Sequence, residues 1–520
     1  MMTVNSKSCS KLFEKIWFQY LIVLFAAGFL YFITCAPTVL WQDSGLFIYR
    51  IWHNDIEGNL GIALSHPLYI MLGIPVKWIP VGEFAWRVNM ISAIFGAVAV
   101  ANLYLLLRLW LGKVWPAVIG AVSLAVSWTF WQNAVWAEAY TLYAAQLFTE
   151  LLVLFQYIRT KRTGYLYWLG FLNGLSIANH LWGVFPLACY GLFLLVLIYQ
   201  KQIKIKHAVL FSLLWILGCL PYLYLIVKGV IESGDFVGTM QSALFGSGWQ
   251  SSVLNTSITV RLALENFMFV LLNFPTPNII LLVVGIAVLW EKTPSRGFAN
   301  ILFALLLMYF VFAFRYKVPD RHAFFLPFYC IAALMMGLGS DFVIQKFSGK
   351  KIIAILLIFS FLPVGSYFIT PALARNYYPS LAERRQRPYR DEYDYWLQPW
   401  KNGYRGAERF AKEALESVEQ NAMIYAYTTD IHAFLYVQEV CGKYPDVKVV
   451  SNHDCSIGQK PLDEETAAKY VSQSLLYTTS GEPSYYPDFL ARYDFVSSGL
   501  LWKVVELNTE EELLNIKEDN

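Results

Sequence analysis

Long apolar runs separated by short polar segments dominate the chain. An α-helix needs about 20 mostly apolar residues to cross about 30 Å of hydrocarbon. The segments predicted to span are 17–37, 84–109, 114–132, 138–158, 165–181, 182–200, 207–228, 277–290 with a lead-in from 262, 298–314, 322–340 and 352–371. The pattern predicts a polytopic α-helical membrane protein with about eleven transmembrane helices.

The stretch 165–200 is divided into two spans because Asn179-His180, followed by Gly183 and Pro186, indicates a turn. A single long helix there would reverse the orientation of everything that follows. The first apolar run, 17–36, is too long for the core of a signal peptide and is interpreted as a retained helix.

Basic residues are distributed unevenly between the two sides that this pattern defines. Cytoplasmic segments of membrane proteins carry an excess of Lys and Arg. With the N-terminus in the cytoplasm, the sixteen inner cations are Lys7, Lys11, Lys15, Arg108, Lys113, Arg159, Lys161, Arg162, Lys201, Lys204, Lys206, Lys292, Arg296, Lys346, Lys350 and Lys351. The five outer ones are Arg50, Lys77, Arg315, Lys317 and Arg321. This distribution places the loops 38–83 and 315–321, and the whole tail after 372, on the extracytoplasmic side.

Composition agrees with a membrane protein and excludes other classes. Hydrophobic residues make up 57% of the chain and charged residues only 15%, and the mean hydropathy is +0.45, beyond what soluble domains show. The net charge of +3 is near balance, which argues against nucleic acid as a partner. The seven cysteines include no C-x-x-C pair; Cys441 and Cys455 are the two that could form a disulfide.

The composition changes near residue 374, where a charged segment rich in Tyr and Pro begins. We therefore divide the chain into a transmembrane domain, 1–373, and a soluble extracytoplasmic domain, 374–520. Within the tail, the pattern predicts helices at 406–419, 430–441 and 464–477 and strands at 422–428 and 446–451. This alternation indicates a small α/β domain.

Asp43 is the most informative residue of the first outer loop. It follows the first span within Trp41-Gln42-Asp43-Ser44-Gly45, at a membrane boundary where an ionisable group is costly unless it is paired or functional. The alternative is that Asp43 caps a short helix. Farther along, His53, Asp55 and Glu57 alternate and could bind a metal, or could form a solvated loop face.

Glu138 and His180 are the next ionisable residues on the outer side. Glu138 begins the fourth span, where it could act chemically or simply favour the N-terminus of a helix. His180 lies at the break between two spans and could be a ligand contact or a hydrogen-bonded turn residue.

Arg315, Lys317 and Arg321 form an unusual group of cations at an outer membrane surface, with Asp320 and His322 beside them. Arg offers paired donors that suit a phosphate. The alternative is anchoring to lipid headgroups, with Asp320 pairing one Arg.

Taken in order, these motifs resemble a family of membrane proteins associated with protein O-mannosyltransferases of the GT-C glycosyltransferase fold. The matching stretches are Pro37-Thr38 through Trp41-x-Asp43-Ser44-Gly45, His66-Pro67-Leu68-Tyr69-x-x-x-Leu72-Gly73, Ala137-Glu138-Ala139-Tyr140, Gly174-Leu175-Ser176-x-x-x-His180-Leu181, Val318-x-Asp320-x-x-x-Phe324-Phe325-Leu326-Pro327, and Tyr436-x-Gln438-Glu439-Val440 with Pro445-Asp446-Val447. The tail turn Thr428-Thr429-Asp430 departs from the acidic, glycine-containing turn of the family.

The resemblance implies a GT-C-like enzyme that moves a mannose-like sugar, with inversion, from a polyprenyl-phosphate carrier to an extracytoplasmic acceptor, a protein Ser/Thr hydroxyl or a glycan. Asp43 is the expected base, and Arg321 with Arg315 or Lys317 the expected phosphate clamp. The expected surrounding residues are His66, Glu138 and His180. No cofactor is required beyond the lipid-linked donor, although a divalent metal stays open.

Two other function classes compete with this interpretation. A transporter or lipid flippase would also place charged residues in the membrane, but its sites gather near the midplane and its halves are often repeats. The candidate residues here gather on one side, and no internal repeat is evident. A non-enzymatic envelope assembly factor presenting its tail domain is the third class.

Overall fold

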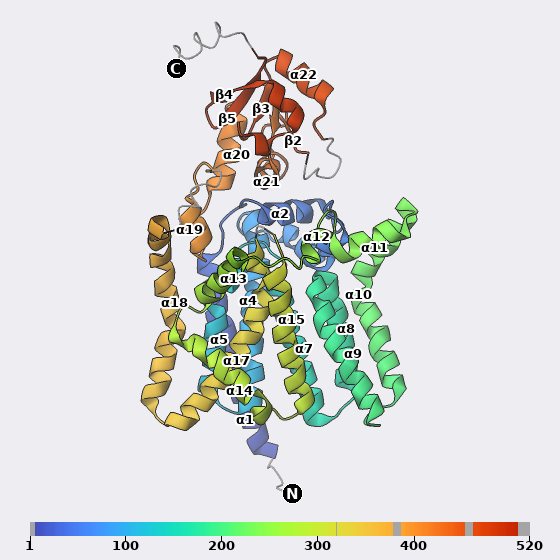
Figure 1. The fold of residues 1–520 in the computed structure, drawn as a ribbon, viewed down its shortest axis with the longest axis vertical. Coiled ribbons are helices and arrows are strands. Elements are labelled where there is room, and N and C mark those ends of the chain that lie inside the picture. Colours follow the sequence, from blue (N-terminus) through green and yellow to red (C-terminus); the bar gives the residue numbers. More distant parts are fainter. Residues whose placement is uncertain (1–5, 319, 378–385, 453–460, 508–520) are drawn as a thin grey trace.

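The protein is a helical bundle with a small sheet domain above one end of it (Figure 1). This computed structural model describes residues 6–318, 320–377, 386–452 and 461–507. Within them, eight helices are long and apolar enough to cross a membrane, or up to ten if each of two bent helix pairs counts as one span. The chain is an integral membrane protein.

Each segment that the sequence predicted to span contains a helix. The long helices are α1 (Ser6–Thr34), α4 (Phe84–Leu111), α7 (Tyr140–Thr160), α9 (Val184–Tyr199), α10 (Ile205–Ser233), α15 (Arg296–Arg315), α17 (Leu326–Phe347) and α18 (Lys350–Tyr377). The predicted segment 165–181 is α8 (Gly164–Asn179), which has 16 residues and is not among the eight helices long enough to cross a membrane. The break predicted at His180 is present, because α8 ends at Asn179 and α9 follows a short 3-10 turn.

Two predicted spans are strongly bent. α5 (Val114–Ala125) and α6 (Trp128–Ala134) meet at 69°, and α13 (Val260–Asn273) meets the segment containing α14 (Ile280–Lys292) at 107°. The second bend turns the lead-in from residue 262 into a separate helix. That helix carries Glu265 and Asn266 to the end of the bundle that faces the sheet domain (Figure 1).

The centre of the bundle is formed by α4, α5, α7 and α17, which share the largest apolar core. α8 and α10 pack beside it along glycines. A Cβ on Gly174 would lie 2.2 Å from the carbonyl oxygen of Trp215, and one on Gly218 would lie 2.2 Å from that of Phe171. Small residues let membrane helices approach at backbone distance, which explains the close packing of α8 on α10.

Short elements cover the end of the bundle that faces the sheet domain (Figure 1). They are α2 (Asp43–His53), η1 (Ile62–Leu64), α3 (Pro67–Gly73), η2 (Ile74–Trp78), α11 (Phe236–Phe245), α12 (Gln250–Val253) and α16 (Arg321–Phe324). The candidate residues from the sequence belong to these elements and to the helix ends beside them.

The C-terminal domain contains a five-stranded sheet with the order β2-β1-β3-β5-β4. Its elements are α19 (Glu392–Leu397), α20 (Gly406–Glu416), β1 (Met423–Tyr425), α21 (Thr428–Leu435) with a π turn (Tyr436–Val440), β2 (Lys448–Val450), α22 (Glu464–Ser472), β3 (Leu476–Thr478), β4 (Asp494–Ser498) and β5 (Leu501–Val505). β1 pairs in parallel with β2 and β3, and β5 is antiparallel to β3 and β4. The predicted α/β domain is confirmed.

The predicted helix 464–477 is wrong at its end. α22 stops at Ser472, and Ser474 has a positive φ of 56°, which starts a turn into β3. The candidate partner of Cys441, Cys455, lies outside the described residues.

The sheet domain packs directly on the helical domain. One apolar core joins α2, α3 and the start of α4 with α20, α21 and β1. Main-chain bonds cross the junction from Gln42 N–H to the Thr429 carbonyl at 3.1 Å, and from Lys401 N–H to the Thr34 carbonyl at 2.8 Å. The tail domain is therefore placed against the loop that follows α1.

Candidate functional site

Asp43 is the first residue of α2. The residue in the cap position is Gln42, whose side chain makes no capping bond. The alternative interpretation of Asp43 as the helix cap is therefore wrong. The Asp43 side chain is solvent-accessible, yet the protein around it raises the pKa of its carboxyl by desolvation. Water therefore reaches the Asp43 carboxyl, although the surrounding protein disfavours its charged form.

Three carboxyls converge at this position, one from each of three distant segments. Burial raises the pKa of Glu138 well above its usual range, and the negative charges of Asp43 and Asp320 raise it further. Burial, followed by the charge of Asp43, raises the pKa of Asp320 to about 7. The structure brings the predicted residues Asp43 and Glu138 together and adds Asp320, which sequence reasoning considered only as a partner for arginine.

The three carboxyls lie in different environments and therefore hold their protons with different affinities. Like charges at short range cannot all ionise together. Asp43 is the solvent-accessible member, whereas Glu138 is buried, so Glu138 holds its proton most firmly. The site thus combines a solvent-accessible carboxyl, Asp43, with carboxyls of higher pKa beside it, an arrangement suited to general-base chemistry.

His66 and His180 lie next to each other, with their ring centroids 5.0 Å apart. Burial lowers the pKa of His66 to about 4 and that of His180 well below its usual range, so both rings are neutral. The Nδ1 atom of His66 lies 2.7 Å from the carbonyl oxygen of Asn179 and donates to it, which leaves Nε2 as an acceptor. The Nδ1 atom of His180 accepts from the Trp182 N–H at 3.1 Å.

Polar side chains of α4 hold the loops that carry the acids. The amide of Asn89 donates to the carbonyls of Ala36 and Thr38 at 3.0 and 3.1 Å and accepts from the Ala137 N–H at 2.9 Å. The Ser92 hydroxyl accepts from the Glu138 N–H at 3.0 Å. Sequence reasoning missed both residues, although buried polar groups in an apolar helix were the available signal.

The predicted cation group is divided in the structure. Arg321 is buried, and it donates to Glu265 Oε2 and Asn266 Oδ1, both at 2.7 Å. Arg315 instead donates to the Asn255 carbonyl at 3.0 Å, and Lys317 is exposed. Arg321 directly follows Asp320, so it is the cation tied most closely to the carboxyl cluster.

The three alternating residues of the first loop take separate partners. His53 Nε2 lies 2.5 Å from Glu439 Oε2, Asp55 lies 3.5 Å from the Nε of Arg50, and Glu57 pairs with Lys228. No group of three His, Cys, Asp or Glu side chains suited to a metal occurs among the described residues.

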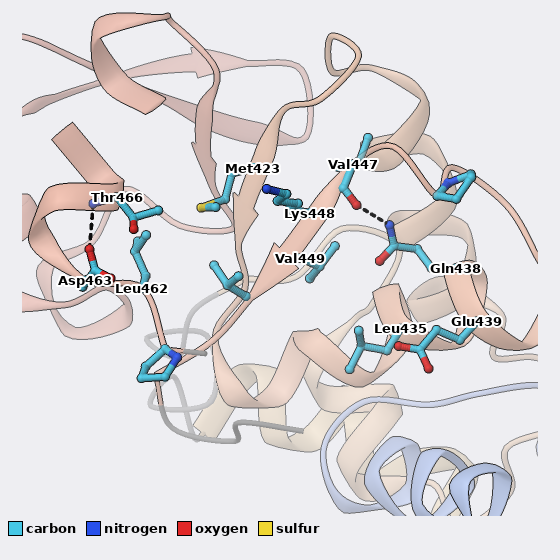
Figure 2. Close-up of a pocket in the computed structure, with 13 residues that line it drawn as sticks. Met423, Leu435, Gln438, Glu439, Val447, Lys448, Val449, Leu462, Asp463 and Thr466 are labelled. Atoms are coloured by element: carbon cyan, nitrogen blue, oxygen red, sulfur yellow. Dashed lines mark hydrogen bonds between the residues drawn. The ribbon is translucent and has the colours of Figure 1, made fainter. Parts of the chain in front are cut away.

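A cavity of about 570 Å³ lies in the C-terminal domain, between edge strand β2 and the start of α22 (Figure 2). Val447, Lys448 and Val449 line one side, and Asp463 and Thr466 the other. None of the residues predicted for the site from sequence lines it.

Comparison with known proteins agrees with the sequence resemblance. Residues 59–204 match the family model described as the Protein O-mannosyl-transferase TMEM260 N-terminal domain. The chain is 27% identical over 198 residues to Protein O-mannosyl-transferase TMEM260 of Mus musculus, covering 36% of this chain and 28% of that protein. The Dictyostelium discoideum protein of that name is 24% identical over 143 residues, covering 26% and 16%. The match thus spans less than a third of either relative, and the predicted resemblance is confirmed.

Solved structures resemble nearly the whole chain. ArnT from Cupriavidus metallidurans bound to undecaprenyl phosphate superposes with a TM-score of 0.59 at 13% identity, covering 93% of this chain and 97% of ArnT. The chain has the GT-C fold. The oligosaccharyltransferase AglB from Archaeoglobus fulgidus, in complex with an inhibitory peptide and a dolichol-phosphate, gives a TM-score of 0.52 at 14% identity, covering 95% and 75%. At such identities the likeness concerns the GT-C fold alone.

Proposed function

We propose that the protein is an inverting membrane glycosyltransferase that moves a mannose-like sugar from a polyprenyl phosphate to a Ser/Thr hydroxyl of an extracytoplasmic protein. The observation that carries the proposal is the convergence of Asp43, Glu138 and Asp320 at one end of a GT-C bundle. The names of the O-mannosyltransferase relatives and the undecaprenyl phosphate bound to ArnT support the substrate classes.

In this mechanism, Asp43 takes the proton from the acceptor hydroxyl while the acceptor oxygen attacks the anomeric carbon. The bond from that carbon to the phosphate oxygen breaks, and the polyprenyl phosphate leaves with the bonding electron pair. Arg321 offers a cation for the leaving phosphate, assisted by Arg315 or Lys317. Holding donor, acceptor and base together lowers the entropic cost of reaction. The step uses no cofactor.

The remaining site residues surround this centre. The neutral rings of His66 and His180 can donate hydrogen bonds to sugar hydroxyls or accept them from these hydroxyls, without adding charge. Protonated Glu138 can donate in the same way. The C-terminal domain covers the first loop, so an acceptor chain would reach Asp43 beside it, and the cavity at β2 offers space for part of that chain.

A comparison of cells with and without this chain tests the proposal. The measurement is the set of glycans on their extracytoplasmic proteins. The expected result is that O-linked mannose is lost from specific Ser/Thr sites when the chain is absent and returns with the wild type. Unchanged glycans, combined with altered movement of lipid or solute across the membrane, would favour the transporter or flippase class instead.

Asp320 provides a pH test of the carboxyl cluster. Because the charge of Asp43 raises the pKa of Asp320, removing that charge should lower the pKa of the Asp320 carboxyl. In Asp43→Asn, Asp320 should therefore titrate at lower pH than in the wild type, as followed from the infrared carboxyl band that Asp320→Asn removes. An unmoved Asp320 titration, or one moved to higher pH, would contradict this coupling.

A further inference from the structure

We propose that Arg387, in the C-terminal domain, is a positioning residue for Asp43, an inference that rests on the proposed function. Arg387 has no place in the sequence motifs and lies 344 positions from Asp43 along the chain. It acts through the backbone of Gln42, the residue that precedes Asp43.

The backbone at Gln42 is in a conformation that L-residues rarely adopt. Its φ is 63° and its ψ is −142°, in a region that only glycine occupies without strain. A non-glycine residue keeps such a conformation only when its surroundings impose it. The carbonyl of Gln42 accepts from the Gly45 N–H at 3.0 Å and the Leu46 N–H at 3.3 Å, so its orientation sets the first turn of α2 and the direction of Asp43.

The constraint on Gln42 comes from the C-terminal domain. The Gln42 N–H donates to the carbonyl of Thr429, in the first turn of α21, at 3.1 Å. Close packing adds to this bond, because a Cβ on Gly45 would lie 2.9 Å from the Cβ of His432. The first turn of α2 is thus pressed against the first turns of α21.

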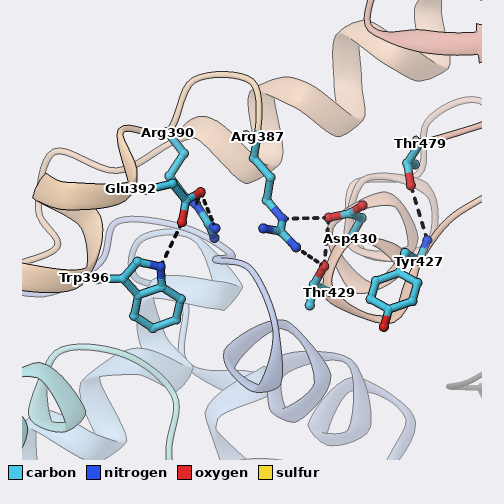
Figure 3. Close-up of polar contacts among 8 residues, drawn as sticks. All are labelled: Arg387, Arg390, Glu392, Trp396, Tyr427, Thr429, Asp430 and Thr479. Atoms are coloured by element: carbon cyan, nitrogen blue, oxygen red, sulfur yellow. Dashed lines mark hydrogen bonds and ion pairs between the residues drawn. The ribbon is translucent and has the colours of Figure 1, made fainter. Parts of the chain in front are cut away.

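Arg387 fixes the turn that carries Thr429 (Figure 3). Its Nε donates to Asp430 Oδ1 at 3.1 Å, and its Nη2 donates to the Thr429 hydroxyl. The Asp430 side chain is fully buried, and the Arg387 side chain is 8% exposed. The contacts of the Arg387 guanidinium with Asp430 and Thr429 are therefore shielded from solvent. The guanidinium also lies 5.8 Å from the ring of Trp41, the residue before Gln42.

Arg387 therefore contacts both sides of the strained turn, Trp41 from the first loop and Thr429-Asp430 from α21. Without it, the buried Asp430 carboxylate would lose its ion pair with Arg387, and the turn holding Gln42 would loosen. Gln42 could then relax, and the carboxyl of Asp43 would move with it. A displacement of about 1 Å at a reacting group costs roughly a hundredfold in rate.

The test measures amide hydrogen exchange and the kinetics of sugar transfer on the full-length protein in a membrane mimetic. Arg387→Ala should speed amide exchange in residues 41–46 and lower kcat about tenfold to hundredfold, with donor affinity unchanged. Arg492→Ala is the matched control, because Arg492 forms an exposed pair with Glu464 in the same domain. It should change neither exchange nor kcat.

Two further variants separate positioning from folding. Thr429→Val removes the hydroxyl that Arg387 holds but keeps the Arg387–Asp430 pair, so it should give a weaker form of the same result even if Arg387→Ala does not fold. Gln42→Gly removes the strain, and adding it to Arg387→Ala should recover part of the lost kcat. A loss through general destabilisation would not be recovered.

Unchanged exchange at 41–46 in folded Arg387→Ala or Thr429→Val would overturn the inference. A parallel fall in donor affinity, or no recovery with Gln42→Gly, would do so as well. If the wild type transfers no sugar, the proposed function fails, and exchange at 41–46 still decides whether Arg387 holds this turn.

Discussion

Asp43→Asn should lower turnover by roughly two to four orders of magnitude, while the affinity for the lipid-linked donor stays near that of the wild type. The substitution keeps the size of the side chain and removes only its ability to take a proton. Fold effects should be small, because Asp43 does not occupy the cap position of α2 and its side chain is solvent-accessible. Initial rates of sugar transfer and donor binding on purified protein measure the two effects separately.

Glu57→Gln is the matched control for Asp43→Asn. Glu57 is an acid of the same outer loop, but it pairs with Lys228 outside the carboxyl cluster. It should transfer sugar at nearly the wild-type rate. Near-wild-type transfer by Asp43→Asn would assign the base to another carboxyl, with Asp320 as the next candidate.

Arg321→Ala should weaken donor binding roughly tenfold to hundredfold, the usual size of a charge-assisted hydrogen bond to a phosphate. Arg321→Lys should recover only part of the loss, because an ammonium cannot reproduce the planar fork. Binding of a polyprenyl phosphate to purified protein, measured by calorimetry, gives the result directly. Unchanged affinity in the Ala variant would remove Arg321 from the clamp.

Glu265→Gln decides whether Arg321 binds donor or only supports the fold. Arg321 donates to Glu265 in the structure, so a purely structural arginine would lose its ion pair in this variant and keep only neutral partners. Stability would then fall without a change in donor affinity. If Arg321 holds the phosphate, removing the competing carboxylate should leave donor affinity equal to or tighter than that of the wild type.

The helical framework was largely readable from sequence, because apolar length is a direct requirement of the bilayer. The break at His180 followed from its glycine and proline neighbours. The sequence analysis did not predict the 107° bend after α13, although Pro275 and Pro277 were the available signal for it. That bend brings Glu265 to Arg321, so the ion pair was not foreseen.

The identity of individual site residues was easier to predict from sequence than their arrangement in space. Asp43 and Glu138 stood out because each is an acid at a membrane boundary. Asp320 was missed as a member of the cluster because Arg321, its neighbour in sequence, offered a simpler partner. The role of Arg387 depends on a main-chain conformation at Gln42, which no composition or spacing reveals.

Transfer by the purified wild type is the most direct measurement of the central claim. The assay supplies a synthetic polyprenyl-phosphate mannose and a Ser/Thr peptide and follows both products. The account predicts a mannosylated peptide of inverted anomeric configuration, with one polyprenyl phosphate released for each sugar transferred. Release of mannose to water alone, a retained configuration, or intact donor after prolonged incubation of folded protein would contradict it.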